Sequence, residues 1–444
     1  MKTLSVIGIG KLGLPLAAYF AYKGYKVIGV DVNPAIIRAV NEGKPPIYEP
    51  GLEELMRGLK GRLSATDDYK SAIANSEITF IIVPTPSEEH GGFSTKYVEA
   101  AARNIAEVLK SKNAFHVVVI TSTVLPGATE TVIKPLLETV SGKKCGVDFG
   151  LCYNPEFIAL GSVIRDLASP DAVLIGESDP RSGEFLVEVY KTVCDNNPPI
   201  VRTTFYNAEV AKLALNVFIT TKISLANVFA EICEQLPGGD VDAVTKFLGL
   251  DSRIGPKYLK GGLGYGGPCF PRDNLAFIAL ARQLNIQAWL QEATHQVNRH
   301  QNERIVKLIQ RKLGDAKGKT IALLGITYKP NTDVVEESAS LETAKRLLED
   351  GASLRIYDPA GNDAARQALG DKKVVYVTSA RDCLKGAQLC ILATPWEEFK
   401  SLTPEDFIAH MEKPLLLDCW RFFDQQKFAG KVDYFALGLS PEVR

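Results

Sequence analysis

Short apolar runs alternate with longer mixed stretches through the first part of the chain. The runs predict strands at residues 2–10, 25–31, 78–83, 117–121 and 172–176. A stretch with the character of a helix, residues 14–22, directly follows the first strand. Strands and helices that alternate in this way predict a parallel, doubly wound sheet.

The pattern changes after about residue 200. Residues from about 203 to 312 are mostly helical, and residues 208–235 form a stretch with few helix breakers. That stretch is too long for a crossover between two strands and suits a spine between domains or subunits. At residues 319–327 the opening pattern returns, followed by a helix at 340–350 and a strand at 354–358.

The chain is therefore predicted to have an α/β fold, with two Rossmann-like doubly wound domains joined by a long helical spine. The expected domains are a Rossmann domain at 1–200, a helical central domain at 201–312, and a Rossmann-like domain at 313–444. The turn of the second Rossmann-like unit lacks the full glycine fingerprint, although Asp358 takes the place that Asp31 holds in the first.

The first strand leads into Gly8-x-Gly10-x-x-Gly13, and the second strand ends at Asp31. The first glycine allows a tight turn, the second admits a pyrophosphate, and the third lets helix and strand pack closely. Asp31 can accept hydrogen bonds from a ribose diol and would repel a 2′-phosphate, which favours NAD over NADP. A glycine-rich turn in some other α/β protein is the alternative.

Composition narrows the class of protein. Lys and Arg number 51 and Asp and Glu 52, so there is no electrostatic case for nucleic acid or an anionic membrane. No apolar run is expected to reach membrane-spanning length, and the first strand starts too early for a signal peptide. We therefore expect a cytoplasmic enzyme.

One cysteine stands out among the eight. Cys269 follows the glycine-rich residues 261–267 and precedes Asp273 by four positions, a setting that suits a nucleophile. The alternative is a glycine-rich turn with an incidental thiol. The other cysteines show neither a CxxC pair nor a disulfide framework, and the scattered histidines predict no metal site.

Ordered segments along the whole chain carry a resemblance to a known family. They are residues 48–52, 83–86, 122–127, 154–157, 207–216, 253–255, 261–273 and 328–333. In these segments the chain resembles the UDP-glucose/GDP-mannose dehydrogenases. The resemblance implies oxidation of the C6 hydroxyl of a nucleotide-bound hexose to a carboxylate, with two NAD molecules used in succession.

The resemblance also implies roles for individual residues. Cys269 would add to the intermediate aldehyde, and the resulting thiohemiacetal would be oxidised to a thioester that water releases. Lys212 would stabilise developing charge on the substrate oxygen, with the help of Asn216 four residues on. Asp273 would position or activate a water, and Thr123 would hold that water near the nicotinamide.

The same resemblance implies the functions of the domains: 1–200 would bind NAD, 201–312 would form the dimer, and 313–444 would bind the UDP-sugar. It also implies the binding residues. The cofactor-binding positions would be Gly8, Gly10, Lys11, Leu12, Gly13, Asp31, Thr85, Thr123, Glu156 and Arg272. The UDP-sugar would contact Phe157, Lys212, Asn216, Arg253, Tyr258, Leu259, Lys260, Gly266, Lys329 and Arg421. Arg253 would reach the site of a neighbouring subunit, which implies a homodimer or a larger homo-oligomer.

Three positions depart from the family pattern. Leu160 replaces a glutamate that glucose-specific members use in thioester hydrolysis, Glu336 replaces an arginine, and Ile36 replaces a basic residue on the cofactor side. An apolar Leu160 could line a pocket for an acetyl methyl group. The sequence therefore leans slightly towards a 2-acetamido sugar, with UDP-glucose as a serious contender.

Two other function classes stay open. A nucleotide-sugar-binding protein whose catalysis has decayed would explain Leu160 and Glu336. A two-electron dehydrogenase of the same architecture would also fit the fold. The set of Cys269, Lys212, Asn216 and Asp273 argues against both, because neither function requires a thiol there.

Overall fold

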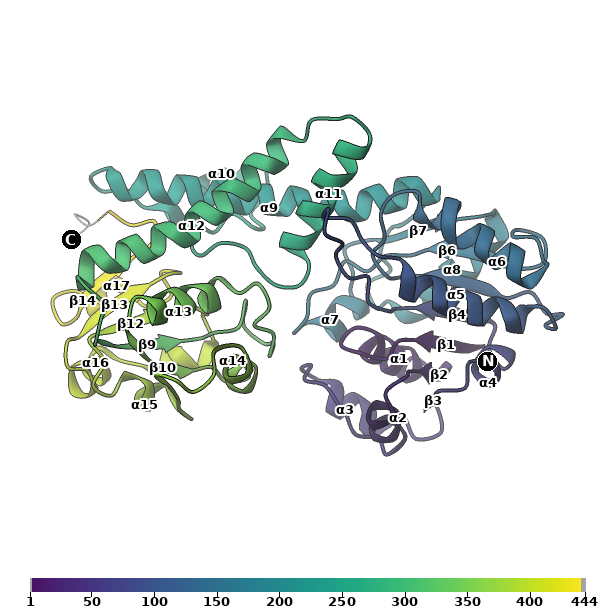
Figure 1. Ribbon diagram of the computed structural model, residues 1–444, viewed down its shortest axis with the longest axis horizontal. Helices are drawn as coiled ribbons and strands as arrows, with labels where there is room; N and C mark the ends of the chain where they lie inside the picture. The colour runs from purple at the N-terminus through teal and green to yellow at the C-terminus, as the bar shows by residue number, and fades with distance from the viewer. Residues whose placement is uncertain (1, 441–444) are drawn as a thin grey trace. The chain divides into compact units, whose positions relative to one another are not determined.

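The computed structural model describes residues 2–440 and divides the chain into two compact units (Figure 1). The first unit ends at Leu215 and the second begins at Asn216. The boundary falls inside one continuous helix, α9 (Phe205–Gln235).

The first unit is built on an eight-stranded sheet in the order β3-β2-β1-β4-β5-β6-β7-β8. β6 and β7 pair antiparallel and the other neighbours pair parallel, so the predicted parallel sheet carries two strands of opposite direction at one edge. The chain leaves β6 through a loop and the short α7 and re-enters from the same end of the sheet. The strands are β1 (Thr3–Ile7), β2 (Lys26–Val30), β3 (Leu63–Thr66), β4 (Ile78–Ile81), β5 (Val117–Ile120), β6 (Gly150–Tyr153), β7 (Val173–Glu177) and β8 (Ile200–Thr203).

Helices cover both faces of this sheet, as the apolar strands require. One face packs against α1 (Gly13–Tyr22), α2 (Pro34–Asn41), α3 (Leu52–Arg57), α7 (Val163–Ala168) and α8 (Pro180–Val193). The other face packs against α4 (Tyr69–Ala74), α5 (Lys96–Leu109), η1 (Thr129–Ile133), α6 (Lys134–Ser141) and the start of α9.

The second unit contains a six-stranded parallel sheet in the order β11-β10-β9-β12-β13-β14, and helices again cover both faces. The strands are β9 (Thr320–Leu324), β10 (Ser353–Tyr357), β11 (Val374–Tyr376), β12 (Leu389–Leu392), β13 (Leu415–Asp418) and β14 (Asp433–Ala436). The covering helices include α13 (Ala339–Glu349), α14 (Asn362–Leu369), α15 (Ala380–Leu384), η2 (Glu397–Ser401), α16 (Pro404–His410) and α17 (Gln425–Phe428).

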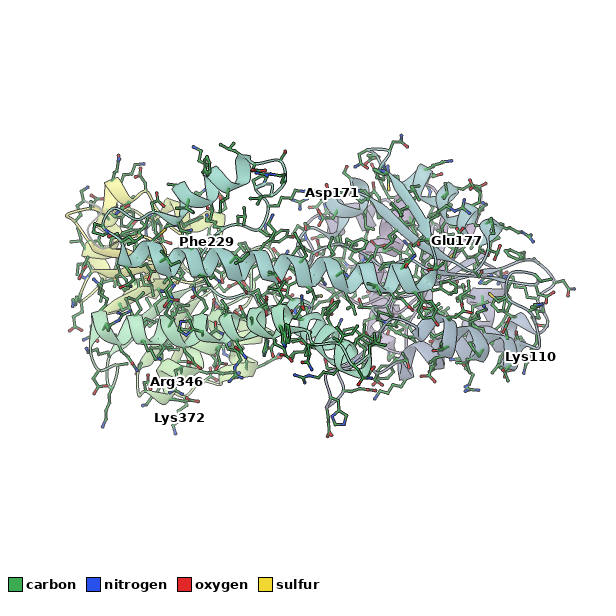
Figure 2. All side chains as sticks on the ribbon, turned by 90° about the horizontal axis from the view of Figure 1, so that it is seen from above. Lys110, Asp171, Glu177, Phe229, Arg346 and Lys372 are labelled. Atoms are coloured by element: carbon green, nitrogen blue, oxygen red, sulfur yellow. The ribbon has the colours of Figure 1, made fainter. Side chains whose placement is uncertain are left out.

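Along the chain, the residues between β8 and β9 are mostly helical. α9 is followed by α10 (Val241–Leu250), α11 (Phe270–Gln283) and α12 (Trp289–Leu313). Within the second unit α9 and α12 lie side by side along a polar seam (Figure 2). The Thr221 and Thr294 hydroxyls lie 3.2 Å apart, and Arg304 donates to Glu234 at 2.6 Å. The two Rossmann-like domains and the helical spine confirm the predicted fold class.

The length of α9 corrects one expectation. Among the described residues it is a helix long and apolar enough, by length and composition, to cross a membrane, whereas the sequence analysis expected no such run. In the structure 44% of its apolar window is buried inside the protein. The same helix buries apolar side chains such as Phe205, Ala208 and Leu213, so part of its apolar character serves packing inside the protein.

Candidate active site

The turn between β1 and α1 has the shape of a phosphate cradle. Gly8 has φ of 87°, and a Cβ there would collide with the carbonyl oxygen of Ile82. A Cβ at Gly13 would collide with the carbonyl of Gly8, whereas Gly10 faces open space. Leu12, the N-cap of α1, gives the helix no side-chain cap, so its first N–H groups can receive a pyrophosphate. These features fit NAD, with Lys11 beside the same turn.

Asp31 lies at the carboxyl end of β2, and only some of the acceptor positions of its carboxylate are used by the protein. Its carboxylate accepts hydrogen bonds from the Ile9 and Asn33 N–H groups, at 3.0 and 2.9 Å. A carboxylate has about four lone-pair positions, so acceptors are left over for a ribose diol. The structure thus places Asp31 where the sequence predicts it.

Two predicted threonines follow neighbouring strands. Thr85 comes after β4 and is buried, and Thr123 comes after β5. Ser122 joins the two segments, because its hydroxyl accepts from the Val83 N–H at 2.9 Å and donates to the Val83 carbonyl at 2.8 Å. Both threonines therefore belong to the carboxyl edge of the sheet, where ligands bind in doubly wound folds.

Lys212 and the segment after β6 form a compact group. The Lys212 ammonium donates to the Glu156 carbonyl oxygen at 2.7 Å and lies 5.3 Å from the centre of the Phe157 ring. The Tyr190 hydroxyl lies 3.3 Å from the Glu156 carboxylate and donates to Asn154 at 2.5 Å. Burial raises the pKa of Glu156 to about 7, against the lowering effects of Tyr190 and Lys212.

This value gives Glu156 a capacity that the sequence analysis missed. A carboxyl group with a pKa near neutrality can both take and return a proton. The sequence predicted Glu156 only as a cofactor contact. The cause is burial of the carboxyl group by segments distant in the sequence, which no local pattern reveals.

Glu209 is a second residue that the sequence analysis missed. Its buried carboxylate accepts from the Gly127 and Thr129 N–H groups, at 2.6 and 2.9 Å. Burial raises the pKa of Glu209, and these backbone bonds oppose the rise. Glu209 thereby anchors the segment that follows Thr123 to α9, less than one turn before Lys212.

Cys269 is the N-cap of α11 in the second unit. Of the cysteines in the described part of the chain, it alone is exposed. A helix N-terminus stabilises negative charge, so the position suits a thiolate. The sequence prediction of a presented thiol agrees with this geometry.

Asp273 lies one turn into α11, with its carboxylate buried. The Asn216 side-chain N–H donates to it at 2.7 Å, and Arg272 lies 3.4 Å away. The backbone N–H of Asp273 donates to the Cys269 carbonyl at 2.8 Å. The structure therefore brings together three predicted site residues of the second unit: Asn216, Cys269 and Asp273.

The residues before Cys269 form a buried segment of irregular backbone, residues 261–267, called here the glycine loop. Its glycines lie against protein atoms. A Cβ at Gly262 would meet the Trp420 ring, and one at Gly267, where φ is 81°, would meet the Tyr328 ring. The glycines are needed because the loop is packed from several sides.

The remaining predicted substrate residues of the second unit differ in their surroundings. Tyr258, Leu259 and Lys260 directly precede the glycine loop, and the Tyr258 ring lies 6.4 Å from that of Phe270. Lys329 follows Tyr328, whose ring packs on the loop. Arg253 is largely exposed and pairs with Asp251 at 2.6 Å.

Arg421 is a different case, because its guanidinium is buried and already engaged. It donates to both oxygens of Asp242, at 2.8 and 2.9 Å, and to the carbonyls of Gly261 and Leu437. These bonds tie Arg421 to the start of the glycine loop. Contact between Arg421 and substrate stays a prediction.

The three residues that depart from the family pattern are Leu160, Ile36 and Glu336. Leu160 and Ile36 pack against the apolar core of the first unit, and Glu336 is exposed. Leu160 is followed by Gly161 and Val163, whose N–H groups each donate to the buried Glu49 at 2.8 Å. Leu160 is partly buried and packs against this core, and the interpretation that it lines an acetyl pocket stays a prediction.

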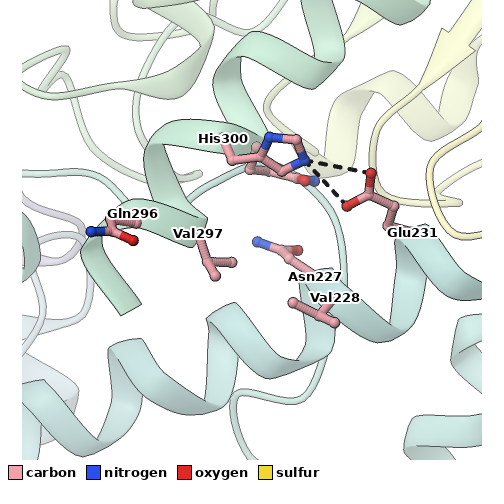
Figure 3. Close-up of a pocket in the computed structure, with 7 residues that line it drawn as sticks. Asn227, Val228, Glu231, Gln296, Val297 and His300 are labelled. Carbon is pink, nitrogen blue, oxygen red and sulfur yellow. Dashed lines mark hydrogen bonds and ion pairs between the residues drawn. The ribbon is translucent and has the colours of Figure 1, made fainter. Parts of the chain in front are cut away.

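A cavity of about 200 Å³ lies between α9 and α12 (Figure 3). Asn227, Glu231, His300 and Gln301 are among the residues that line it, and the His300 Nε2 lies 3.4 Å from a Glu231 carboxylate oxygen. None of the predicted site residues lines this cavity. Within residues 2–440 no group of three or more His, Cys, Asp or Glu residues is placed to hold a metal ion.

Comparison with known families matches the chain to three family models. The NAD binding domain of the UDP-glucose/GDP-mannose dehydrogenase family matches residues 2–194. The central domain of that family matches residues 206–300, and its UDP binding domain matches residues 322–425.

Individual proteins match over nearly the full length. The UDP-glucose 6-dehydrogenase AglM of Haloferax volcanii is 40% identical over 437 residues, which cover 98% of this chain and 99% of that protein. A UDP-glucose dehydrogenase structure from Pyrobaculum islandicum is 37% identical with a TM-score of 0.87, and covers 97% of this chain and 98% of its own. The UDP-D-ManNAc dehydrogenase structure from Pyrococcus horikoshii is 26% identical with a TM-score of 0.84, at coverages of 98% and 99%.

Proposed function

This chain belongs to the UDP-glucose/GDP-mannose dehydrogenase family, and we propose that it oxidises the C6 hydroxyl of a UDP-hexose to a carboxylate, with Cys269 holding the sugar between two oxidations. It is an NAD-dependent nucleotide-sugar dehydrogenase, so the predicted family, enzyme class and cofactor are confirmed. The observation that carries the proposal is the exposed Cys269 at the N-terminus of α11, beside the buried Asn216–Asp273 pair.

The proposed reaction balances in two stages. NAD, when bound, accepts one hydride from C6 at each stage. Loss of the first hydride and of the hydroxyl proton leaves an aldehyde. The Cys269 thiolate forms a bond to C6, the oxygen takes up a proton, and loss of that proton with the second hydride gives a thioester. Water then adds to the carbonyl carbon, and the carbon–sulfur bond breaks to release the acid and the thiolate.

In the second unit, Asp273 and Asn216 would serve the aldehyde and thioester stages. Asp273 is an acceptor that can orient a water, and Asn216 fixes its carboxylate through a 2.7 Å hydrogen bond. The helix N-terminus of α11 would favour the thiolate both as attacking and as leaving group.

In the first unit, Lys212 and Glu156 would handle charge and protons. The Lys212 ammonium can stabilise negative charge that develops on an oxygen of the substrate. The Glu156 carboxyl, whose pKa burial raises to about 7, can accept the proton of the C6 hydroxyl or of the hydrolytic water. We add this role for Glu156 to the predicted cofactor contact, and it takes up part of the hydrolytic function that Leu160 cannot perform.

UDP-glucose is the sugar nucleotide we favour. The relatives named for UDP-glucose share 40% and 37% identity with this chain, whereas the relative named for UDP-D-ManNAc shares 26%. Leu160, the residue that favoured an acetamido sugar, packs on the apolar core. Specificity constants for UDP-glucose, UDP-N-acetylglucosamine and UDP-N-acetylmannosamine test this choice, and a higher constant for either acetamido sugar would contradict it.

The stoichiometry of Cys269→Ser tests the mechanism. The parent should yield two NADH and one uronic acid per sugar, whereas the variant should stop before release of the acid because a serine hydroxyl is a far weaker nucleophile. Cys194→Ser, which removes a thiol elsewhere, serves as the control. One NADH per sugar with free aldehyde from the parent would support a two-electron dehydrogenase, and no NADH with tight UDP-sugar binding would support a decayed binding protein.

We also propose that the enzyme is at least a dimer through its central helices. Most large apolar side chains that are exposed in residues 2–440 lie between Tyr206 and Leu290. Phe218, Phe247 and Leu250 are each more than two-thirds exposed, and a monomer rarely leaves such an area uncovered. Arg253, exposed in the same region, is then available to a neighbouring subunit.

Analytical ultracentrifugation tests the assembly. The parent should sediment as a dimer or larger, and Phe247→Glu with Leu250→Glu should lower its mass because each places a charge in an apolar contact. Ile408→Glu, an exposed apolar position in α16, is the matched control. A parent that sediments as a monomer would contradict the proposal.

A further inference from the structure

The glycine loop is buried but belongs to no helix or strand. Buried backbone N–H and C=O groups need hydrogen-bond partners, and irregular backbone cannot supply them from a ladder of its own. In this loop, side chains provide hydrogen-bond partners for the backbone groups. Cys269 follows the loop after Pro268, so the contacts that hold the loop also determine the position of the exposed thiol.

Asn298 of α12 holds the middle of the loop. Its side-chain oxygen accepts from the Tyr265 N–H at 2.8 Å, and its side-chain N–H donates to the Tyr265 carbonyl at 3.0 Å. One amide thus pairs with both backbone groups of one residue, as a neighbouring strand would. Asn298 is itself buried, and a Cβ at Gly264 would come within 2.6 Å of its oxygen.

Two further buried amides hold the start of the loop. Asn227 of α9 accepts from the Gly262 N–H at 2.8 Å, and Gln301 of α12 donates to the Gly262 carbonyl. Both side chains also line the cavity between α9 and α12, so the loop is held from the polar seam of these helices.

We propose that Asn298, assisted by Asn227 and Gln301, is a positioning residue for the second oxidation, because it fixes the glycine loop and thereby the place of Cys269. The inference rests on the proposed function of Cys269. Asn298 acts through the loop and is not itself a catalytic residue.

The chemistry of the site requires an amide. A leucine at position 298 has a similar size but leaves the N–H and C=O of Tyr265 without partners. An ionised aspartate keeps the acceptor but turns a second oxygen towards the Tyr265 carbonyl, and only its protonated form can donate again. The two variants therefore differ in their dependence on pH.

The experiment uses the full-length enzyme with Asn298→Leu and Asn298→Asp. Gln296, an exposed amide on the same helix, provides the matched controls Gln296→Leu and Gln296→Glu. Alkylation of Cys269 by iodoacetamide is followed from pH 6 to 9 by mass spectrometry. Single-turnover NADH formation with UDP-glucose separates the first hydride transfer from the second.

In Asn298→Leu the second hydride transfer and the alkylation rate should each change by about tenfold or more, because small displacements of a reacting group have large effects on rate. The first hydride transfer and KM should stay within about twofold, a split that a general loss of folded protein would not produce. In Asn298→Asp the defect relative to the parent should grow as the pH rises. The controls should behave as the parent.

Two results would overturn the inference, and they are distinguishable. If Cys269→Ser is inactive while Asn298→Leu and Asn298→Asp match the parent in alkylation and in the second transfer, only the positioning role falls. If Cys269→Ser oxidises the UDP-sugar at the parent's rate, both the proposed function of Cys269 and the positioning role of Asn298 are contradicted. Should Asn298→Leu fail to fold, Asn298→Asp decides, and a rate of alkylation and of second hydride transfer equal to the parent's in that variant counts against the proposal.

Discussion

The two Rossmann-like units share the order of strands around their first strand. The turn that follows this strand is open in the first unit and filled by side chains in the second. Each places an aspartate after its second strand, Asp31 in the first unit and Asp358 in the second. In each, a residue after the first strand donates its N–H to that aspartate: Ile9 at 3.0 Å and Ile326 at 2.8 Å. From that point the two sites diverge.

Asp358 is saturated with partners from its own unit. Its carboxylate accepts from the N–H groups of Ile326, Thr327, Ala360 and Gly361, the hydroxyl of Thr327 and the indole N–H of Trp396. The position that Gly10 leaves open in the first unit is taken here by the buried Thr327. The second unit therefore keeps the frame of a dinucleotide fold without room for a ribose at this aspartate.

The same contrast recurs between Glu156 and Asp418. Burial raises the pKa of both carboxyl groups. Asp418 accepts from three backbone N–H groups and from the Tyr434 hydroxyl, whereas the polar contact that the structure shows for the Glu156 carboxylate is the Tyr190 hydroxyl at 3.3 Å. A carboxylate with unused acceptor positions can bind a ligand or accept a proton. A carboxylate whose acceptor positions are all taken stabilises the fold.

The largest effect should come from Asp358→Asn. It leaves buried donors without an acceptor and should lower the free energy of unfolding of the second unit by about 3 kcal/mol or more. All three tryptophans lie in that unit, so their fluorescence in urea reports its unfolding. Asp31→Asn is the matched control and should change this stability little. Equal losses in the two variants would remove the contrast.

The next effect should appear in Glu156→Gln. As a base the carboxyl must be ionised, so kcat/KM of the parent should rise with pH through about 7 and level off above it. The variant should lose this rise and about a hundredfold in kcat, because general acid–base groups contribute at least that much. Glu130→Gln, at a partly exposed carboxylate, is the control. A variant with the same pH profile as the parent would exclude Glu156 as the proton acceptor.

Asp31→Asn should weaken NAD binding by about tenfold and narrow the preference over NADP, since it removes a ribose acceptor and a repelling charge. Calorimetric titration with both cofactors measures the change. Asp358→Asn should leave cofactor affinity unchanged wherever the protein is folded. Unchanged NAD affinity in Asp31→Asn would show that this aspartate does not face the ribose.

The smallest effect concerns the stability of the first unit at acid pH. His116 is buried between the Thr79 hydroxyl and the Ser76 carbonyl, and burial lowers its pKa to about 3. The unfolded state, with an ordinary histidine pKa, binds more protons, so stability falls as the pH drops below about 6.5. From pH 7 to pH 6 this linkage should cost about 0.7 kcal/mol.

His116→Gln should abolish that dependence, because glutamine does not titrate. Far-UV circular dichroism follows both units in urea, whereas tryptophan fluorescence follows the second. The pH dependence should therefore appear in the first signal and be absent from the second. The same dependence in both signals would show that His116 is not its source.

Some of the site could be predicted from the sequence because its signals are local. The Gly8–Gly13 turn, Asp31, and Cys269 behind the glycines are recognisable from turn chemistry and spacing alone. The long α9 helix was predicted from residue 208 and begins at Phe205. Glu209, Asn298 and the proton capacity of Glu156 were missed, because each depends on partners tens of residues away, such as Gly127, Tyr265 and Tyr190.

The sequence by itself determined the elements, their order and the residue types at the turns, since these follow from periodicity and backbone preference over short distances. It could not separate Asp31 from Asp358, which follow the same kind of strand. Only the tertiary structure decided that Thr327 and Trp396 fill the acceptor positions of Asp358 while those of Asp31 stay open. Hydrogen bonding is short-ranged, and which donors come within reach depends on how distant segments pack.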